Sequence, residues 1–339
     1  MAVITVEKNI SAYAGCQADN LLPEVLYSTQ PLVLKGLVDS WPVVQAARES
    51  VQQTVDYLCQ FSTDEPLTVF RGGPEIDGRV FYNEDLTGFN FEASRLPMAE
   101  IISELTQSGG QSDAPMLYVG STMIDKWLPG FRAKNDLALD QFNPLVSIWM
   151  GNRSRIAAHY DFADNIACCV AGRRRFILFP PDQLPNLYVG PLDFTPAGQP
   201  ISLVDFANPD FERFPKFREA LKNAQVIELE PGDALMIPSM WWHHVEALED
   251  FNILVNYWWR NSPAFMGAPL NVLQHAVMGL RDLPVEQRAA WKQIFEHYVF
   301  DAVEGNFEHI PKASRGVINT MTEDAAKQIR TLLKNRLTR

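Results

Sequence analysis

Between residues 144 and 259, short apolar runs follow one another, and turn residues rather than long helical patterns separate them. Gly151-Asn152, Gly172 and Pro231-Gly232-Asp233 are examples of these turns. Many short strands with turn signals between them indicate an all-β sandwich or barrel. The predicted strands cover residues 145–150, 157–160, 165–170, 175–179, 225–229, 234–237, 243–247 and 251–259.

The chain on either side of this stretch has a different pattern. Before it, residues 51–61 and 98–105 have helical spacing, and strands are predicted at 67–71 and from residue 117. After Pro263 the pattern becomes helical. The helices predicted there cover residues 269–280, 285–303 and 322–336.

These patterns predict a mainly β protein with flanking helices. We expect an N-terminal α/β region at 1–115, a barrel at 116–262 and a helical C-terminal subdomain at 263–339. Within the barrel, residues 182–224 form a segment rich in Pro, Asp and Phe that is too long for a hairpin loop. Such a segment is either a functional insertion or forms some helix of its own.

Composition and charge narrow the possible partners. The 339 residues are 47% hydrophobic and 21% charged, and the formal net charge is −12. This acidic balance argues against a general affinity for nucleic acid or anionic membranes, although a local basic patch remains possible. No apolar stretch approaches the roughly 18 residues of a membrane span. The first 14 residues have no secretory pattern, so we expect a cytoplasmic location.

The four cysteines fit a reducing compartment, and two of them, Cys168 and Cys169, are expected to be packing residues. Cys16, Cys59, Cys168 and Cys169 show neither CxxC spacing nor a disulfide framework. Because Cys168 and Cys169 are neighbours on a predicted strand, their side chains should point to opposite faces.

A candidate metal site begins at His159-Tyr160-Asp161. Positions i and i+2 of a strand face the same way, so the imidazole and the carboxylate should point together. A second imidazole is available at His243 or His244, after a Pro-Gly-Asp turn and a short strand. Two histidines and one carboxylate leave open positions on a metal, as in non-haem iron(II) oxygenases. Zinc hydrolases use the same ligand types, so the triad alone does not name the metal.

The strings around these residues resemble the cupin-like branch of the Jumonji C (JmjC) oxygenases, which includes the asparaginyl hydroxylase of hypoxia-inducible factor. The matching segments are residues 159–161, 176–183, 204–215, 231–246 and 255–258, together with Asn165. The resemblance implies a double-stranded β-helix (jelly-roll, cupin-like) core with Fe(II) in its mouth. It also implies that His159, Asp161 and His243 are the metal ligands, and that His244 packs nearby.

The resemblance further implies that 2-oxoglutarate is the cosubstrate. Tyr118 matches a tyrosine that binds the far carboxylate of 2-oxoglutarate, and Asn165 and Asn256 match asparagines that line the pocket. Asn165 lies four residues after Asp161, which gives it the same inward parity if the strand is regular. Asn256 is a lone polar residue on an apolar strand, and it could instead bond a neighbouring backbone group.

Two positions depart from the family pattern. Arg174 stands where the relative has a lysine that pairs with the same carboxylate, and an inward arginine could bind it through two hydrogen bonds. Alternatively, Arg173, Arg174 and Arg175 together form a solvated hairpin edge. Ile156 replaces a threonine whose hydroxyl contributes to that carboxylate site. Trp241, Trp242 and Trp258 are expected only to form part of the pocket wall.

By this resemblance the activity would be hydroxylation with 2-oxoglutarate and O2, releasing succinate and CO2. Residues 199–203 lack the arginine that the relative uses to recognise its substrate, so protein, tRNA and small-molecule substrates remain open. The alternatives are a non-catalytic metal-binding cupin and a metal-dependent isomerase or hydrolase on the same barrel. The helical spacing of Leu270, Leu273, Val277 and Leu280 could also support a homodimer.

Overall fold

The structure is a computed structural model that describes residues 6, 8–111, 113–196 and 198–338. The chain divides into two compact units, Met1–Asn261 and Ser262–Arg339. The secretory pattern was sought in residues 1–14, and of these, residues 1–5 and 7 lie outside the described residues. Among the described residues, no helix has both the length and the apolar character needed to cross a bilayer.

The first unit is built on two sheets, which over the described residues contain six and nine strands. The six-stranded sheet has the order β1 (Lys8–Asn9), β12 (Gln225–Leu229), β11 (Arg174–Phe179), β14 (Trp242–Ala247), β9 (Ser154–Tyr160), β5 (Arg79–Val80). The nine-stranded sheet has the order β2 (Ser11–Ala12), β3 (Leu32–Leu34), β13 (Ala234–Ile237), β10 (Asp164–Ala171), β15 (Asn252–Trp259), β8 (Leu145–Gly151), β7 (Met116–Met123), β4 (Leu67–Gly72), β6 (Glu92–Leu96). The two sheets with flanking helices confirm the predicted jelly-roll fold class.

Side-chain alternation along the strands separates an interior between the sheets from two outer faces. On β11, Phe176 and Leu178 pack in the interior, whereas Ile177 and Phe179 pack outside the six-stranded sheet. On β10, Cys169 lies in the interior and Cys168 lies on the outer face of the nine-stranded sheet. The prediction that the two cysteines face opposite ways is therefore confirmed.

The turn between β10 and β11 requires a glycine. Gly172 has φ +69°, a left-handed conformation that favours residues without a Cβ. A Cβ there would also lie 2.6 Å from the carbonyl oxygen of Phe251. This turn sets the register of β11 and therefore the inward direction of Arg174, its first residue.

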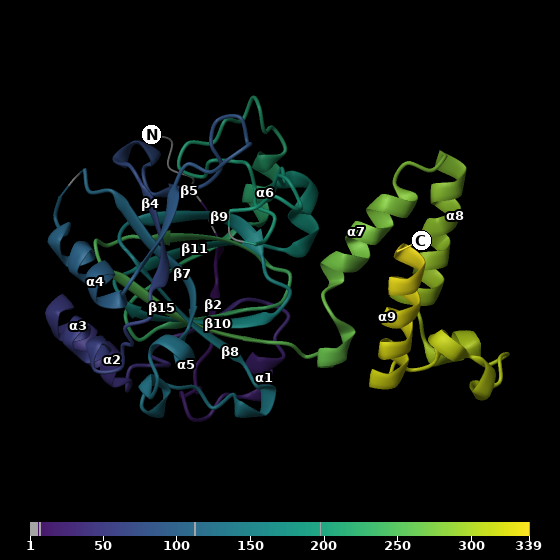
Figure 1. The fold of residues 1–339 in the computed structure, drawn as a ribbon, viewed down its shortest axis with the longest axis horizontal. Helices are drawn as coiled ribbons and strands as arrows, with labels where there is room; N and C mark the ends of the chain where they lie inside the picture. Colours follow the sequence, from purple (N-terminus) through teal and green to yellow (C-terminus); the bar gives the residue numbers. More distant parts are fainter. Residues whose placement is uncertain (1–5, 7, 112, 197, 339) are drawn as a thin grey trace. The chain divides into compact units, whose positions relative to one another are not determined.

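Helices of the N-terminal region cover the outer face of the nine-stranded sheet (Figure 1). Apolar residues of these helices, such as Val44, Leu58 and Ile101, pack in the same cluster as Cys168. The α-helices of this region are α1 (Pro23–Leu26), α2 (Pro42–Glu49), α3 (Val51–Cys59), α4 (Met98–Gln107) and α5 (Ile124–Trp127). The predicted helices at 51–61 and 98–105 are confirmed as α3 and α4.

The segment 182–224 covers the outer face of the six-stranded sheet. It starts inside a 3₁₀ helix (Pro181–Asn186) and ends just after α6 (Phe217–Asn223), which Figure 1 shows beside β9 and β11. Phe206 and Phe217 of this segment pack with Trp242 of β14. The prediction that the segment forms some helix of its own is confirmed.

The second unit is helical, as predicted. Its α-helices are α7 (Pro269–Leu280), α8 (Val285–Phe295) and α9 (Glu323–Leu337). The predicted helix at 285–303 is shorter, because α8 ends at Phe295 and passes into a π-helical turn, Glu296–Phe300. The side chain of Thr322 caps α9 by accepting a hydrogen bond from the amide of Ala325.

Candidate functional site

A cluster of two histidines and one aspartate lies where β9 and β14 pair. His159 of β9 is directly opposite His243 of β14, and their ring centroids are 4.3 Å apart. One ligand atom from each of His159, Asp161 and His243 lies within 4.8 Å of the other two, which is close enough for all three to hold one metal ion. Asp161 lies one residue beyond β9, which ends at Tyr160. The predicted strand at 157–160 and β9 thus end at the same residue, and the side chains of His159 and Asp161 point together as expected, with Asp161 just beyond the strand.

Both histidines present the same nitrogen to this cluster. Nδ1 of His159 bonds the carbonyl oxygen of Ala157 at 2.9 Å, and Nδ1 of His243 bonds that of Trp241 at 3.0 Å. A carbonyl only accepts, so Nδ1 carries the proton in each ring and Nε2 keeps a lone pair for a metal. Burial, together with the neighbouring His159, lowers the pKa of His243 to about 4 and keeps the ring neutral.

His244 lies on the opposite face of β14 from this cluster. Its ring packs on Phe206 with centroids 4.5 Å apart, and its Nε2 is 3.3 Å from a carboxylate oxygen of Glu246. Burial lowers the pKa of His244, which the bond to Glu246 opposes. The fold thus groups His243, and not His244, with His159 and Asp161.

Trp258 contacts the aspartate of the cluster from the other sheet. Its indole Nε1 donates a hydrogen bond to Oδ2 of Asp161 at 3.1 Å. The same Oδ2 atom is 3.7 Å from Nε2 of His243. From the sequence, Trp258 was expected only to form part of the pocket wall. Trp258 and Asp161 lie 97 positions apart, and no local sequence pattern links them.

Arg174 is a buried cation deeper in the interior. It is 3% exposed, and its Nε has no hydrogen-bond partner among the described residues. Burial lowers the pKa of Arg174, and burial also raises the pKa of Tyr118, which the nearby Arg174 charge opposes. Burial likewise raises the pKa of the Cys169 thiol to about 12, again opposed by Arg174. A buried guanidinium without a carboxylate beside it is a site suited to an anionic ligand.

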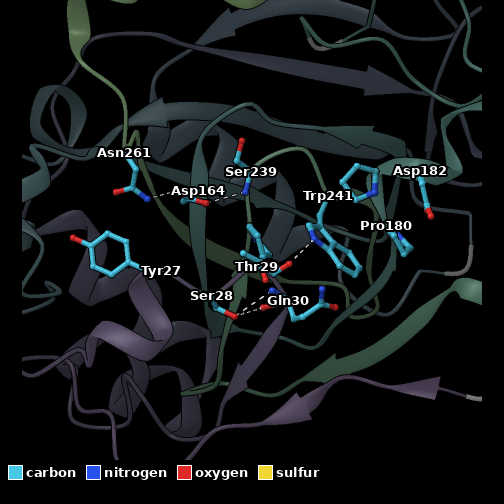
Figure 2. A pocket seen from close by; sticks show the side chains of 12 residues that line it. Tyr27, Ser28, Thr29, Gln30, Asp164, Pro180, Asp182, Ser239, Trp241 and Asn261 are labelled. Atoms are coloured by element: carbon cyan, nitrogen blue, oxygen red, sulfur yellow. Dashed lines mark hydrogen bonds between the residues drawn. The ribbon is translucent and has the colours of Figure 1, made fainter. Parts of the chain in front are cut away.

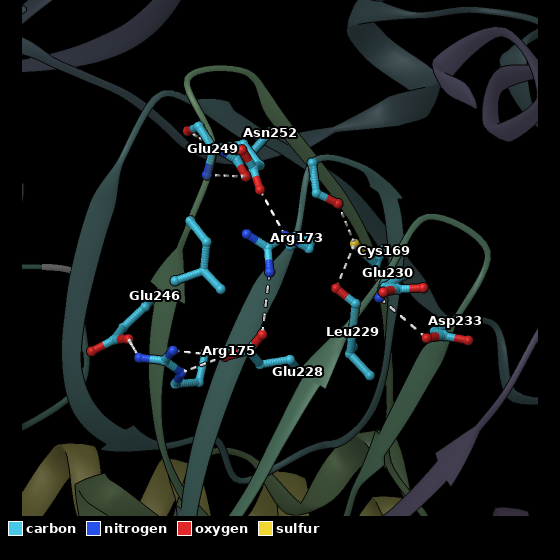
Figure 3. Close-up of polar contacts among 12 residues, drawn as sticks. Cys169, Arg173, Arg175, Glu228, Leu229, Glu230, Asp233, Glu246, Glu249 and Asn252 are labelled. Carbon is cyan, nitrogen blue, oxygen red and sulfur yellow. Dashed lines mark hydrogen bonds and ion pairs between the residues drawn. The ribbon is translucent and has the colours of Figure 1, made fainter. Parts of the chain in front are cut away.

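The two neighbours of Arg174 along the chain are more exposed than Arg174 and are paired with glutamates. Arg175 forms ion pairs with Glu228 and Glu246 at 2.6 and 3.0 Å, and Arg173 pairs with Glu249 at 2.7 Å (Figure 3). The alternative that the three arginines form a solvated edge holds for Arg173 and Arg175 and is wrong for Arg174. Ile156, at the position of the family threonine, packs in the same interior cluster as Tyr118 and offers no polar atom there.

The two asparagines bond each other on neighbouring strands of the nine-stranded sheet. Nδ2 of Asn256 donates to Oδ1 of Asn165 at 2.7 Å, and Oδ1 of Asn256 has no partner among the described residues. Asn256 therefore bonds the side chain of Asn165, and not a neighbouring backbone group as the alternative proposed. Asn165 was expected to face inward if one regular strand ran from Asp161, and that condition does not hold, because the chain leaves one sheet at Tyr160 and enters the other at Asp164. Asn165 nonetheless faces inward, since it shares the parity of Ala167 and Cys169 on β10.

A pocket of about 570 Å³ is lined in part by segments that flank the histidine–aspartate cluster in the sequence (Figure 2). His159, Asp161 and His243 themselves are not among its lining residues. Trp241 lines it, donating from Nε1 to the carbonyl of Thr29 at 3.1 Å, while its own carbonyl accepts from His243. Asp164 lies at the other side, where its carboxylate accepts from the amide of Ser239 and the side chain of Asn261. No sequence pattern predicted that residues 27–30 form a wall of this pocket, because Thr29 lies 212 positions from Trp241.

Comparison with known proteins agrees with this architecture. The sequence model of the family described as cupin-like domain matches residues 18–265, which is more than half of the chain. The chain belongs to the cupin-like domain family. The membership confirms the JmjC-type resemblance inferred from the sequence.

Among the relatives of this cupin-like chain, human tRNA wybutosine-synthesizing protein 5 is 30% identical over 81% of this chain and 90% of its own length. Lysine-specific demethylase JMJ31 of Arabidopsis thaliana is 34% identical over 34% of this chain. Human HSPB1-associated protein 1 is 34% identical over 33% of this chain. These two alignments cover only 21% and 23% of the relatives' own lengths.

Proposed function

We propose that the chain is an Fe(II)- and 2-oxoglutarate-dependent oxygenase. The observation that carries the proposal is that one interior holds both a metal-type cluster and a buried arginine for which the described residues provide no ion-pair partner. Leu178 is opposite His243 in the register of β11 and β14, and Arg174 lies four residues deeper along β11 on the same face. That is roughly 13 Å of strand, a depth that an arginine side chain and a five-carbon dicarboxylate can span together.

The residues divide into a metal-binding set and an anion-binding set. His159, Asp161 and His243 would hold Fe(II) through two Nε2 atoms and one carboxylate oxygen. Arg174 and Tyr118 would bind the far carboxylate of 2-oxoglutarate, which would neutralise the buried guanidinium. When bound, iron and 2-oxoglutarate supply the oxidation by O2, with succinate and CO2 as products.

Asn165 and Asn256 would line the space between the two sets. In their mutual bond Nδ2 of Asn256 is the donor, which leaves Oδ1 of Asn256 without a partner among the described residues, so it can accept from a water molecule or from a donor group of the substrate. The surrounding apolar residues, including Phe176, Leu235 and Leu254, exclude water from the interior. Exclusion of water strengthens the attraction between Arg174 and an anion.

The test is anaerobic reconstitution with Fe(II), followed by measurement of O2-dependent succinate release from 2-oxoglutarate. Wild-type protein is expected to release succinate, and Asp161→Ala is expected to release none. Binding of N-oxalylglycine to Mn(II)-loaded protein provides a second readout. Metal binding without any 2-oxoglutarate binding would instead support the non-catalytic cupin or the metal-dependent isomerase.

The primary substrate is proposed to approach through the pocket beside Trp241. Its volume of about 570 Å³ accommodates a side chain, a nucleobase or a small metabolite. The relative aligned over most of both chains is a tRNA wybutosine-synthesizing protein, so tRNA belongs in a succinate-release screen with peptides and metabolites. The net charge of −12 means that tRNA binding would need a local basic surface.

We propose that the helical second unit mediates homodimerisation, and we retain the three-part division at residues 115 and 262. Leu273 is 43% exposed and Trp291 is 41% exposed, and the described residues of α7 and α8 include none that is buried. Apolar surface of this kind is typical of an interface. We also propose a cytoplasmic location, which the four free cysteines support.

A further inference from the structure

We propose that Trp258 is a positioning residue for the metal site: its indole N–H orients the Asp161 carboxylate for monodentate metal binding. The inference rests on the proposed metal site. Trp258 would not touch the metal, and it would act only through Asp161. The hydrogen bond of 3.1 Å from Nε1 to Oδ2 is the contact on which it depends.

Asp161 needs such a contact because its strand does not hold it. It lies one residue past β9, and its backbone carbonyl accepts from the amide of Met240, a residue with φ +70° in the turn before β14. An aspartate side chain at such a position can rotate about two torsions. A tryptophan N–H only donates, so it selects one carboxylate oxygen and fixes the plane of the group.

The ring of Trp258 is itself held in place. It packs edge-on against Trp149 with centroids 5.8 Å apart, and Trp149 packs against Tyr118 at 6.0 Å. Asn256, two residues earlier on β15, is fixed by its bond to Asn165. The donor atom of Trp258 is therefore set by the nine-stranded sheet, while the histidines are set by the six-stranded sheet.

This arrangement determines how many positions stay open on the metal. A carboxylate that binds through both oxygens would occupy one more position than a carboxylate that binds through one. A two-histidine, one-carboxylate site needs three open positions for a bidentate cosubstrate and O2. Holding Oδ2 of Asp161 with an N–H donor favours the monodentate mode.

The experiment uses Co(II), whose visible absorption reports the ligand set, and a matched pair of variants. Trp258→Phe removes the N–H donor and keeps an aromatic ring. Trp259→Phe makes the same change in the next residue of β15, whose ring packs on the outer face of the nine-stranded sheet and whose Nε1 is buried and has no partner among the described residues. Incorporating 3-benzothienylalanine at position 258 keeps the shape of the indole and removes only the donor. It covers the case in which the phenylalanine variant does not fold.

We expect Trp258→Phe to weaken Co(II) binding by about 10- to 100-fold and to change the Co(II) spectrum, as loss of an outer hydrogen bond to a ligand does. Trp259→Phe should keep the Kd within about twofold and leave the spectrum unchanged, because its ring lies on the face away from Asp161. A wild-type Kd and spectrum for both position-258 variants would overturn the role of Trp258 and leave the metal site standing. Failure of the wild-type protein to bind Co(II) would overturn the proposed metal site itself.

Discussion

Replacing Arg174 by Met should move stability and cosubstrate binding in opposite directions. Arg174 is 3% exposed and, among the described residues, no carboxylate pairs with it. Burying an uncompensated charge costs several kcal/mol, so a methionine of similar length should raise the unfolding free energy of the metal-free protein by about 1–4 kcal/mol. Urea denaturation of the metal-free variant measures this change.

The same substitution should remove the partner of the cosubstrate carboxylate. Truncating one member of a buried, hydrogen-bonded charge pair costs about 2–5 kcal/mol. At about 1.4 kcal/mol per factor of ten, the Kd of N-oxalylglycine should rise about 30-fold to several thousand-fold. Calorimetric titration of Mn(II)-loaded protein measures the Kd.

Arg175→Met is the matched control. Arg175 is the next residue on β11 but lies on the outer face, paired with Glu228 and Glu246. Its loss should leave the Kd within about twofold and change stability by no more than about 1 kcal/mol. Unchanged N-oxalylglycine binding by Arg174→Met would refute the anchor, and a less stable metal-free variant would refute the claim that the buried charge is uncompensated.

Four further outcomes are expected. His243→Ala should abolish Co(II) binding and His244→Ala should retain it, as measured by Co(II) titration. His244→Ala should lose about 1–3 kcal/mol of unfolding free energy because its ring makes buried contacts, as measured by urea melts. Because burial lowers the pKa of His243 to about 4, the metal-free protein should lose stability as pH falls from about 6.5 toward 4, measured by urea melts across that range. Ile156→Thr should tighten N-oxalylglycine binding several-fold by adding a hydroxyl beside the anchor, measured by calorimetry. Leu273→Asp should shift the protein toward monomer in analytical ultracentrifugation, and an unchanged mass would argue against the α7 interface.

Most strands of the barrel were predictable because they are short and are separated by turn residues, which rarely occur inside a strand. The predicted strand at 225–229 coincides with β12, and the strand predicted at 145–150 became β8 with one added residue. Local pattern could also place Arg174 inward, since Phe176 and Leu178 on the same face are apolar. Such periodicity reports which face is buried, and the burial observed here follows it.

What could not be predicted depends on pairing between distant segments. Asn165 was expected to face the same way as Asp161 on the condition that one regular strand contains both. Instead, three residues between Tyr160 and Asp164 carry the chain from one sheet to the other. The bond from Trp258 to Asp161 and that from Trp241 to Thr29 both join segments far apart in the sequence. Spacing along the chain carries no information about such contacts, because they depend on strand order and register.

The division of the site between two sheets couples both of its binding steps to the distance between the sheets. The histidines and Arg174 belong to the six-stranded sheet, whereas Tyr118, Trp258 and the two asparagines belong to the nine-stranded sheet. An interior substitution that widens the gap between the sheets, such as enlarging Ala167, would leave the His159–His243 pairing intact. It would pull Tyr118 away from Arg174 and Trp258 away from Asp161. Metal affinity and cosubstrate affinity should therefore fall together, and both would report how tightly the two sheets close.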